Sequence, residues 1–390
     1  MSQDTITAIS FSDGSDLQIG SAVAIRPEPS VIVGDNWLGR IVGYDGKVAG
    51  ATSNMMVQHL KSGPPPATMR RGIGNRLSTG WMVCDALLPI CRGQRMGLFA
   101  GSGVGKSTLL GALANSIEAD RVVIGLIGER SREVREFATS VLTPQVRSKA
   151  VIVSATAGEP PAAKKRAAYC AMTAAEHFRD QGHHVLLLMD SVTRFAEAHR
   201  EIALLAGEQP ALHAFPPSTV RTVAELLERA GPGAMTDNAG SGTGSDAGPG
   251  AGAGDITAIF SVLVAGSDLE EPVADMMRGI LDGHIVLSRE IAERGRYPAV
   301  NVLASVSRAL PKAASESESA LIHKARAVIA TYEDALPMVQ AGLYQAGTDS
   351  AIDEALTVFP KLDAFIATPN PDSIDAAFAT LSNCLGSADD

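Results

Sequence analysis

The stretch AGSGVGKST, residues 100–108, constrains the fold of this chain more than any other part of its sequence. It follows the apolar run MGLF and precedes LLGALA, so a buried strand should lead through a glycine-rich turn into a helix. Glycines at 101, 103 and 105 let successive backbone N–H groups point into one concavity, and the helix N-terminus adds positive potential. The pattern predicts a loop that binds polyphosphate.

The residues after the glycines have the chemistry that a nucleotide needs. We expect Lys106 to neutralise the β- and γ-phosphates, Ser107 to give its hydroxyl to Mg²⁺, and Thr108 to bond a phosphate oxygen. Ala100 stands where the usual pattern has glycine, which costs little if this position does not need positive φ. The alternative is a glycine-rich turn that only begins an ordinary helix. The candidate binding residues are Gly101, Ser102, Gly103, Val104, Gly105, Lys106, Ser107 and Thr108.

Short apolar runs alternate with helical patterns from residue 77 to residue 310. Such uninterrupted apolar strands, separated by helices, are typical of a largely parallel sheet that is covered on both faces. The sequence therefore predicts an α/β core. The expected strands are MGLFA, VVIGLIG, AVIVSA, VLLLMD, ITAIFSVLV and AVNVLAS.

Two carboxylates follow expected strands. Asp190 ends the run VLLLMD and is the candidate acid that holds Mg²⁺, directly or through water; alternatively it only caps the next helix. Glu129 ends VVIGLIGE, and the carboxyl ends of parallel strands face the ligand crevice. In this position Glu129 would polarise the attacking water. Because the segment ERSREVRE is densely charged, Glu129 could instead cap the next helix or form a solvated ion pair. Spacing leaves both alternatives open.

A last group of candidates lies in RGRYPAVNVLASVSRALP. Tyr297 precedes a strand and Arg308 follows one. Each is either functional or structural: Tyr297 could be a core aromatic residue, and Arg308 could form an ion pair at the end of the strand. The eight histidines form no ligand pattern, so we expect no metal site beyond nucleotide-bound Mg²⁺.

The flanking segments differ from the core in composition. Residues 1–62 contain short β-branched runs cut by Gly, Pro and Asp, which predict a small β-rich segment, and residues 63–76, with three consecutive prolines, predict a linker. Residues 231–255 are almost entirely Gly, Ala, Ser, Pro and Asp and predict a mobile surface loop inside the core. Residues 311–390 show apolar spacing of three and four, which predicts a helical C-terminal domain.

Composition excludes several classes of protein. With 33 basic and 43 acidic residues the net charge is −10, which argues against broad attraction to nucleic acid or anionic lipid. Apolar runs are shorter than a membrane helix, and the N-terminus has no secretory pattern. The four cysteines lack C-x-x-C spacing, so we expect reduced thiols in the cytoplasm.

Five segments together resemble the export ATPase of the bacterial flagellum and the related type III secretion ATPases, relatives of the catalytic subunits of rotary ATP synthases. The resemblance covers most of residues 75–310. It implies a RecA-like P-loop NTPase core, homohexamers, and ATP hydrolysis at subunit interfaces. The segments are TGWMVCDALLPICRGQRMGLFAGSGVGKSTLL, GLIGERSREVREF, MDSVTRFAEAHREIAL, FPPSTVRTVAELLERAG and EPVADMMRGILDGHIVLSREIAERGRYPAVNVLASVSR.

The resemblance also assigns roles to individual residues. Glu129, in GER, resembles the family's catalytic carboxylate, and Arg130 is similar to a residue near the γ-phosphate. Arg308, in SVSR, matches the arginine finger that a subunit extends into its neighbour's site. Tyr297, in RYPAV, resembles the aromatic residue that packs on adenine, and Tyr344, in AGLYQAGTD, resembles a second adenine contact.

Partners and location also follow from the resemblance. It implies Mg²⁺-dependent ATP hydrolysis that assists protein export, driven by proton motive force, through a flagellar or type III secretion apparatus. Expected partners are the membrane gate, a stator or regulator, and chaperone–substrate complexes, with the protein in the cytoplasm at the inner face of the cell membrane. The family's N-terminal β-barrel has about a hundred residues, whereas 62 precede the linker here. Two alternatives remain: a weakly catalytic paralogue that binds nucleotide to organise an export platform, and a rotary ATP synthase subunit.

Overall fold

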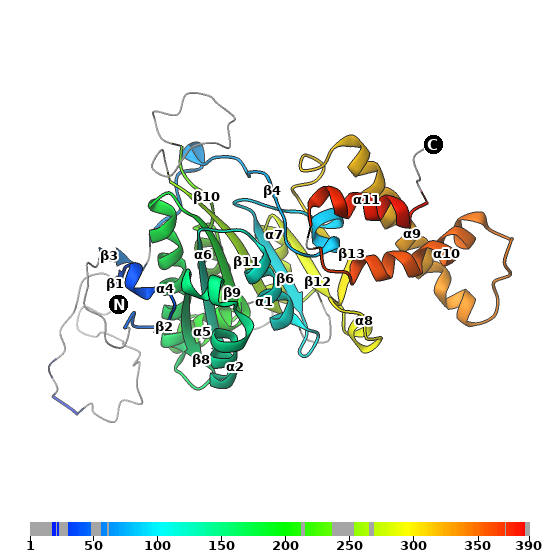
Figure 1. The fold of residues 1–390 in the computed structure, drawn as a ribbon. Helices are drawn as coiled ribbons and strands as arrows, with labels where there is room; N and C mark the ends of the chain where they lie inside the picture. Colours follow the sequence, from blue (N-terminus) through cyan, green and yellow to red (C-terminus); the bar gives the residue numbers. More distant parts are fainter. Residues whose placement is uncertain are drawn as a thin grey trace.

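The computed structural model describes residues 18–20, 22, 30–47, 56–60, 62–211, 215–235, 253–264, 269–370 and 372–386. A nine-stranded sheet runs through the centre of the molecule (Figure 1). All neighbouring strands are parallel except β13, which is antiparallel to β12, and β10 (Gly231–Pro232), which pairs with the start of β11. The other strands, in spatial order, are β13 (Val300–Ser307), β12 (Gly283–Leu287), β6 (Arg95–Ala100), β11 (Asp255–Leu263), β9 (His184–Asp190), β7 (Arg121–Glu129), β8 (Ala150–Thr156) and β2 (Arg40–Gly43).

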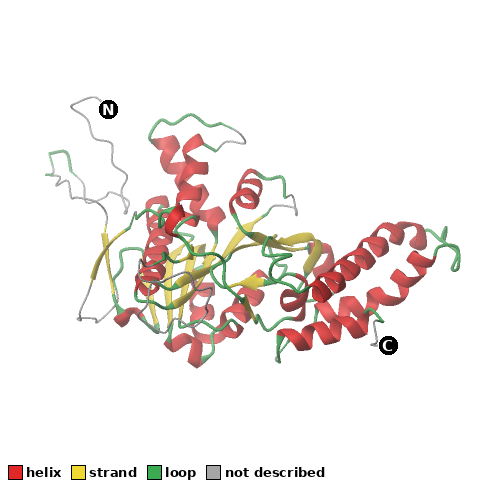
Figure 2. Cartoon of the chain, turned by 90° about the horizontal axis from the view of Figure 1, so that it is seen from above, coloured by secondary structure: helices red, strands yellow, loops and turns green. Residues whose placement is uncertain are grey.

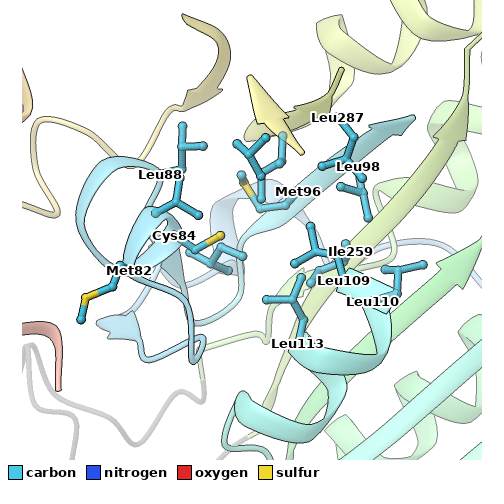
Figure 3. Close-up of a cluster of buried hydrophobic side chains, with 14 of the residues drawn as sticks. Met82, Cys84, Leu88, Met96, Leu98, Leu109, Leu110, Leu113, Ile259 and Leu287 are labelled. Atoms are coloured by element: carbon cyan, nitrogen blue, oxygen red, sulfur yellow. The ribbon is translucent and has the colours of Figure 1, made fainter. Parts of the chain in front are cut away.

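Helices cover both faces of this sheet, as the alternation of strands and helices predicts. Strand residues alternate between two cores: in β7, Val122 and Ile124 lie in one and Val123 in the other. Figure 3 shows the first core, where Leu109 and Leu113 of α1 lie among strand residues such as Leu98. This core includes residues of α1 (Lys106–Ser116), α2 (Ser131–Glu136), η4 (Phe137–Val141), α3 (Pro144–Ser148) and α8 (Arg289–Glu293). The second includes residues of α4 (Pro161–Asp180), α5 (Val192–Leu205), α6 (Pro217–Leu227) and α7 (Pro272–Ile280).

The N-terminal segment is joined to the core more closely than the predicted boundary at residue 62 suggests. β1 (Ser30–Val33) and β3 (Met56–His59) form a small antiparallel sheet, but β2 between them extends the central sheet beside β8. Arg166 of α4 donates hydrogen bonds to the carbonyls of Ser30 and Tyr44, each at 3.1 Å. Segment 1–62 therefore supplies an edge strand of the core. Apart from Ala22, the predicted strand SAVAIRP lies outside the described residues.

The predicted linker and loop meet at the amino edge of the sheet. Linker residues 63–76 contain the short helix η2 (Ala67–Met69), and the Arg71 N–H donates to the carbonyl of Gly233 at 3.1 Å. The Arg71 guanidinium also contacts Asp255, 2.7 Å away. The linker is therefore bound to both ends of the segment 231–255. Most of that predicted mobile loop, residues 236–252, lies outside the described residues.

Three helices form the C-terminal domain, as the apolar spacing predicts: α9 (Glu316–Gln340), α10 (Ser350–Ile366) and α11 (Ile374–Cys384). α9 and α10 form a hairpin that projects from the core (Figure 2), and Tyr332 stacks on Phe359 with ring centroids 3.6 Å apart. Its base rests on η3 (Val83–Leu87), which lies between β4 (Arg76–Leu77) and β5 (Ile90–Cys91). In the described part of the chain, no helix is long and apolar enough to cross a bilayer.

Candidate functional site

The glycine-rich loop joins β6 to α1, as its sequence predicts. Ala100 is the last residue of β6 and pairs with β11 and β12, so this position is extended and does not need glycine. Gly103 and Gly105 have φ of 79° and 90°, values that side-chain-bearing residues rarely adopt. Gly105 is the N-cap of α1 and no side chain caps that helix end. The first N–H groups of α1 are thus available to an anion.

Lys106 contacts both predicted carboxylates. Its Nζ forms an ion pair with Asp190, and Glu129 Oε1 lies 3.5 Å away. Asp190 and Glu129 are the last residues of β9 and β7, which are adjacent parallel strands, so both side chains are at the same edge of the sheet. The structure therefore brings together the loop lysine and the two acids that the sequence singles out.

Ser261 completes this group, and sequence reasoning missed it. It lies on β11, between β6 and β9, and its hydroxyl donates a 2.5 Å hydrogen bond to Asp190 Oδ1. Ser261 is an internal residue of an apolar strand, and only the order of the strands reveals that it faces the acid. The bond fixes the orientation of the Asp190 carboxylate.

The pKa of Glu129 is raised to about 7 from its ordinary value of 4.5. Burial is the main cause, the negative charge of Asp190 adds to it, and Lys106 opposes both. A carboxyl group with a pKa near neutrality can exchange a proton with water under physiological conditions. This is the property that a general base needs.

A cavity of about 430 Å³ lies against this group. Ser107, Thr108, Glu129 and Asp190 contribute to its wall, together with Glu133 and Glu136 of α2, which the sequence analysis did not single out. Among the described residues no cluster of three metal-binding side chains occurs. Ser107 and Asp190 instead offer one hydroxyl and one carboxylate, a set that fits Mg²⁺, which usually keeps water and takes phosphate oxygens as further ligands.

Tyr297 lies at the other side of the loop. Its side chain is 50% exposed, and a Cβ added to Gly105 would be 3.3 Å from its Cδ1. The ring therefore rests on the last glycine of the loop. An exposed aromatic face beside a phosphate-binding loop is suited to stacking on a base.

The three remaining candidates each have another partner in the structure. Arg130 is 82% exposed and pairs with Glu133 at 3.4 Å. Arg308 follows β13, and because β13 is antiparallel to β12 it emerges at the opposite edge of the sheet, where it donates to the carbonyl of Arg278 at 2.9 Å. The connection between α9 and α10 lies at the far end of the hairpin (Figure 1). Tyr344 belongs to this connection, and its hydroxyl donates to Asp353 at 2.8 Å. The role of Tyr344 as a second adenine contact stays a prediction.

Comparison with known proteins explains this combination of a loop, two acids and a helical hairpin. Residues 80–307 match the family model for the nucleotide-binding domain of the ATP synthase alpha/beta family. The chain belongs to the ATP synthase alpha/beta family. Residues 314–381 match the model of the T3SS EscN ATPase C-terminal domain, which places this member beside the export enzymes of the family.

Individual relatives agree with this assignment. The flagellum-specific ATP synthase of Caulobacter vibrioides is 43% identical over 375 residues, which cover 94% of this chain and 82% of the relative. The SPI-2 type 3 secretion system ATPase of Salmonella typhimurium is 40% identical, with 91% of this chain and 79% of the relative covered. This member of the family is an ATPase of the flagellar and type III secretion export group.

A solved structure has the same fold. The assembled ATPase EscN of the enteropathogenic Escherichia coli type III secretion system matches with a TM-score of 0.83 and 37% identity, covering 91% of this chain and 83% of EscN. EscN has also been solved in complex with its central stalk, EscO. The RecA-like core and the C-terminal helical domain expected from the sequence are confirmed.

Proposed function

We propose that this chain hydrolyses Mg²⁺–ATP in a homohexamer and that the hydrolysis assists protein export through a flagellar or type III secretion apparatus. The observation that carries the proposal is the convergence of Lys106, Glu129 and Asp190 at the end of the glycine-rich loop. This group combines a cation for phosphate, a buried acid for the metal and a second acid whose pKa is near neutrality.

Each residue then has a distinct role. Lys106 and the N–H groups of residues 101–108 bind the phosphates, and Tyr297 stacks on adenine. Ser107 and Asp190 would hold Mg²⁺, which neutralises phosphate charge when bound. Glu129 accepts a proton from the attacking water, and Ser261 keeps Asp190 oriented. Arg130, which is exposed beside Glu129, supplies a further positive charge toward the γ-phosphate.

The position of Arg308 supports a shared site. The Arg308 N–H donates to the carbonyl of Asp282 at 2.9 Å, just before β12 begins at Gly283, and Leu287 at the other end of β12 pairs with Ala100. Since strands advance about 3.3 Å per residue, Arg308 lies roughly 15 Å along the sheet from its own phosphate loop. An arginine side chain does not span that distance. Arg308 would therefore act as an arginine finger in the site of an adjacent subunit.

Partners follow from the same proposal. EscN assembles as an oligomer and binds a central stalk, and a ring of this chain would bind an equivalent stalk, along with the export gate, a regulator and chaperone–substrate complexes. Such a ring would work in the cytoplasm at the inner face of the cell membrane.

The experiment is steady-state ATP hydrolysis per subunit across a wide range of protein concentrations, with Mg²⁺ and with Mg²⁺ chelated. Activity per subunit should rise with concentration and then reach a plateau, and chelation should abolish it. Activity that is independent of concentration would contradict the shared site. If nucleotide binds and no hydrolysis occurs at any concentration, the chain is instead a nucleotide-binding paralogue that organises an export platform.

A further inference from the structure

Arg289 lies beside the glycine-rich loop, although no motif in the sequence marks it. It is the first residue of α8, and only Ser288 separates it from the end of β12. β12 is parallel to β6, and Leu287 pairs with Ala100, so the two strands end side by side. Gly101, which follows β6, and Arg289, which comes shortly after β12, therefore lie at the same edge of the sheet.

The guanidinium lies against the loop itself. A Cβ added to Gly101 would be 3.8 Å from an Arg289 Nη2 and 3.6 Å from the carbonyl oxygen of Val264. Gly101 is buried whereas Arg289 is exposed. A side chain at residue 101 would thus occupy the space between the strand end and the arginine, and glycine leaves this approach open.

Arg289 has no counter-ion among the residues that the structure describes. Across the described ranges of the chain, its guanidinium forms no hydrogen bond or ion pair. Arg296, in the same connection between β12 and β13, instead contacts Asp363 at 3.1 Å and two backbone carbonyls. A cation beside a loop that itself presents N–H groups and a helix N-terminus adds to the positive potential there and so favours the binding of an anion.

The order of the strands indicates which part of a nucleotide Arg289 would meet. Lys106 points toward Asp190 and Glu129, on the β9 and β7 side of β6. Arg289 is on the opposite side, in the same connection that carries Tyr297. A nucleotide with adenine on Tyr297 and its γ-phosphate near Lys106 and Glu129 would have its inner phosphates between these two ends.

We propose that Arg289 binds the α- and β-phosphates of the nucleotide from the β12 side of the loop. This inference rests on the proposed nucleotide site and adds a second cation to it. Guanidinium groups bind phosphate oxygens in pairs of parallel hydrogen bonds, which lysine does not. Arg289 therefore contributes to affinity for ADP as well as for ATP, and its contribution does not require Mg²⁺.

The test compares the full-length parent chain with Arg289→Met, Arg289→Lys and a matched control, Arg294→Met. Arg294 is in the same connection, near Glu333, and its loss changes the net charge equally. The dissociation constant of ADP is measured by calorimetry without Mg²⁺. Because a hydrogen bond to a charged group contributes about 1.5–3 kcal/mol, Arg289→Met should weaken ADP binding roughly 10- to 100-fold. Arg289→Lys should recover only part of this loss, and Arg294→Met should bind ADP like the parent chain.

Two readouts separate phosphate binding from a structural role. The loss in kcat/KM for ATP should come mainly from KM, and the melting temperature should stay within about 2 °C of the parent, as expected for an exposed side chain. ADP affinity that is unchanged in Arg289→Met, or reduced equally in Arg294→Met, overturns the inference. If the parent chain binds ADP but does not hydrolyse ATP, the proposed hydrolysis is wrong. The ADP affinities of the Arg289 variants still test whether Arg289 binds phosphate. If the parent binds no nucleotide, both proposals fall.

Discussion

At the scale of single residues, Glu129 and Asp190 are two acids that face one lysine. Burial of Glu129, together with repulsion from the charge of Asp190, raises the pKa of Glu129 to about 7. The folded chain thus binds this proton more tightly than an unfolded chain would. Stability from this source is fully present below pH 4.5 and is lost as the pH rises through about 7.

Glutamine mimics the protonated form of Glu129. We predict that Glu129→Gln leaves the free energy of unfolding unchanged near pH 4 and raises it at pH 8.5 by on the order of 1–3 kcal/mol. Urea unfolding of the nucleotide-free chain at both pH values measures this difference. Glu136→Gln, in the same cavity wall but on an exposed ion pair, is the control and should show no such trend. Equal effects at both pH values would refute the raised pKa.

The same side chain should shape the activity profile. A general base must be ionised, so kcat/KM for ATP should decline as the pH falls below about 7, and Glu129→Gln should remove most of the turnover at every pH.

Sequence reasoning found the residues that follow apolar runs and missed those that depend on strand order. Lys106, Asp190 and Glu129 were predictable because each stands at the end of a strand or the start of a helix, where local pattern and position in the fold coincide. Ser261 and Arg289 were not, since their proximity to the loop is set by which strands are neighbours and in which register. That information is not local.

At the scale of elements, buried hydrogen bonds to Asp85 connect the core to the C-terminal domain. Asp85 of η3 accepts hydrogen bonds from the N–H and the hydroxyl of Thr79, both at 2.7 Å, and from the Asn370 side chain at 2.7 Å. Asn370 also donates its N–H to the carbonyl of Gly80 at 2.8 Å. One carboxylate therefore links the segment before β6 to the chain after α10.

Removal of this carboxylate should loosen the joint. Asp85→Ala removes the acceptor of three buried hydrogen bonds, and we predict a loss of about 2–4 kcal/mol in the free energy of unfolding. Asn370→Ala, which leaves Asp85 its two bonds to Thr79, should cost less. Urea titration of both variants and of the double variant gives the coupling energy. A double variant whose loss equals the sum of the two single losses would show that the two side chains do not act together.

The elements themselves were predicted unevenly. Six strands and the three C-terminal helices have long apolar patterns, and all are present. β12, of five residues, begins with Gly283 and was missed because it is too short to stand out from the helical patterns beside it. β2 was assigned to a separate N-terminal segment, and its four residues carry no sign that they pair in parallel with β8, more than a hundred positions away.

At the scale of the whole molecule, the two parts of the proposed catalytic site lie at opposite edges of one sheet. The phosphate loop is at the carboxyl edge of β6, and Arg308 follows the antiparallel strand β13 at the amino edge. Such an arrangement favours head-to-tail contacts between copies, which close into a ring.

Mixing two inactive variants tests this arrangement directly. Lys106→Ala removes a subunit's own phosphate contact, and Arg308→Ala should lower turnover about 10³-fold or more while nucleotide still binds. At an equal mixture, about a quarter of the interfaces in a ring would combine an intact loop with an intact arginine, so activity should reappear on mixing. Purified variants, mixed before assembly and assayed for ATP hydrolysis, give the measurement. A mixture as inactive as its components would indicate that Arg308 acts within its own subunit.

Lys106 has a second consequence. It is the counter-ion of Asp190, whose side chain is only 5% exposed, and it must turn away from that acid to reach a phosphate group. A buried carboxylate that loses its cation is strongly destabilised. A divalent ion bound with the nucleotide would supply positive charge to Asp190 when Lys106 turns to the phosphates, and a nucleotide without that ion would not. The site should therefore bind a nucleotide together with its divalent ion more readily than the nucleotide alone.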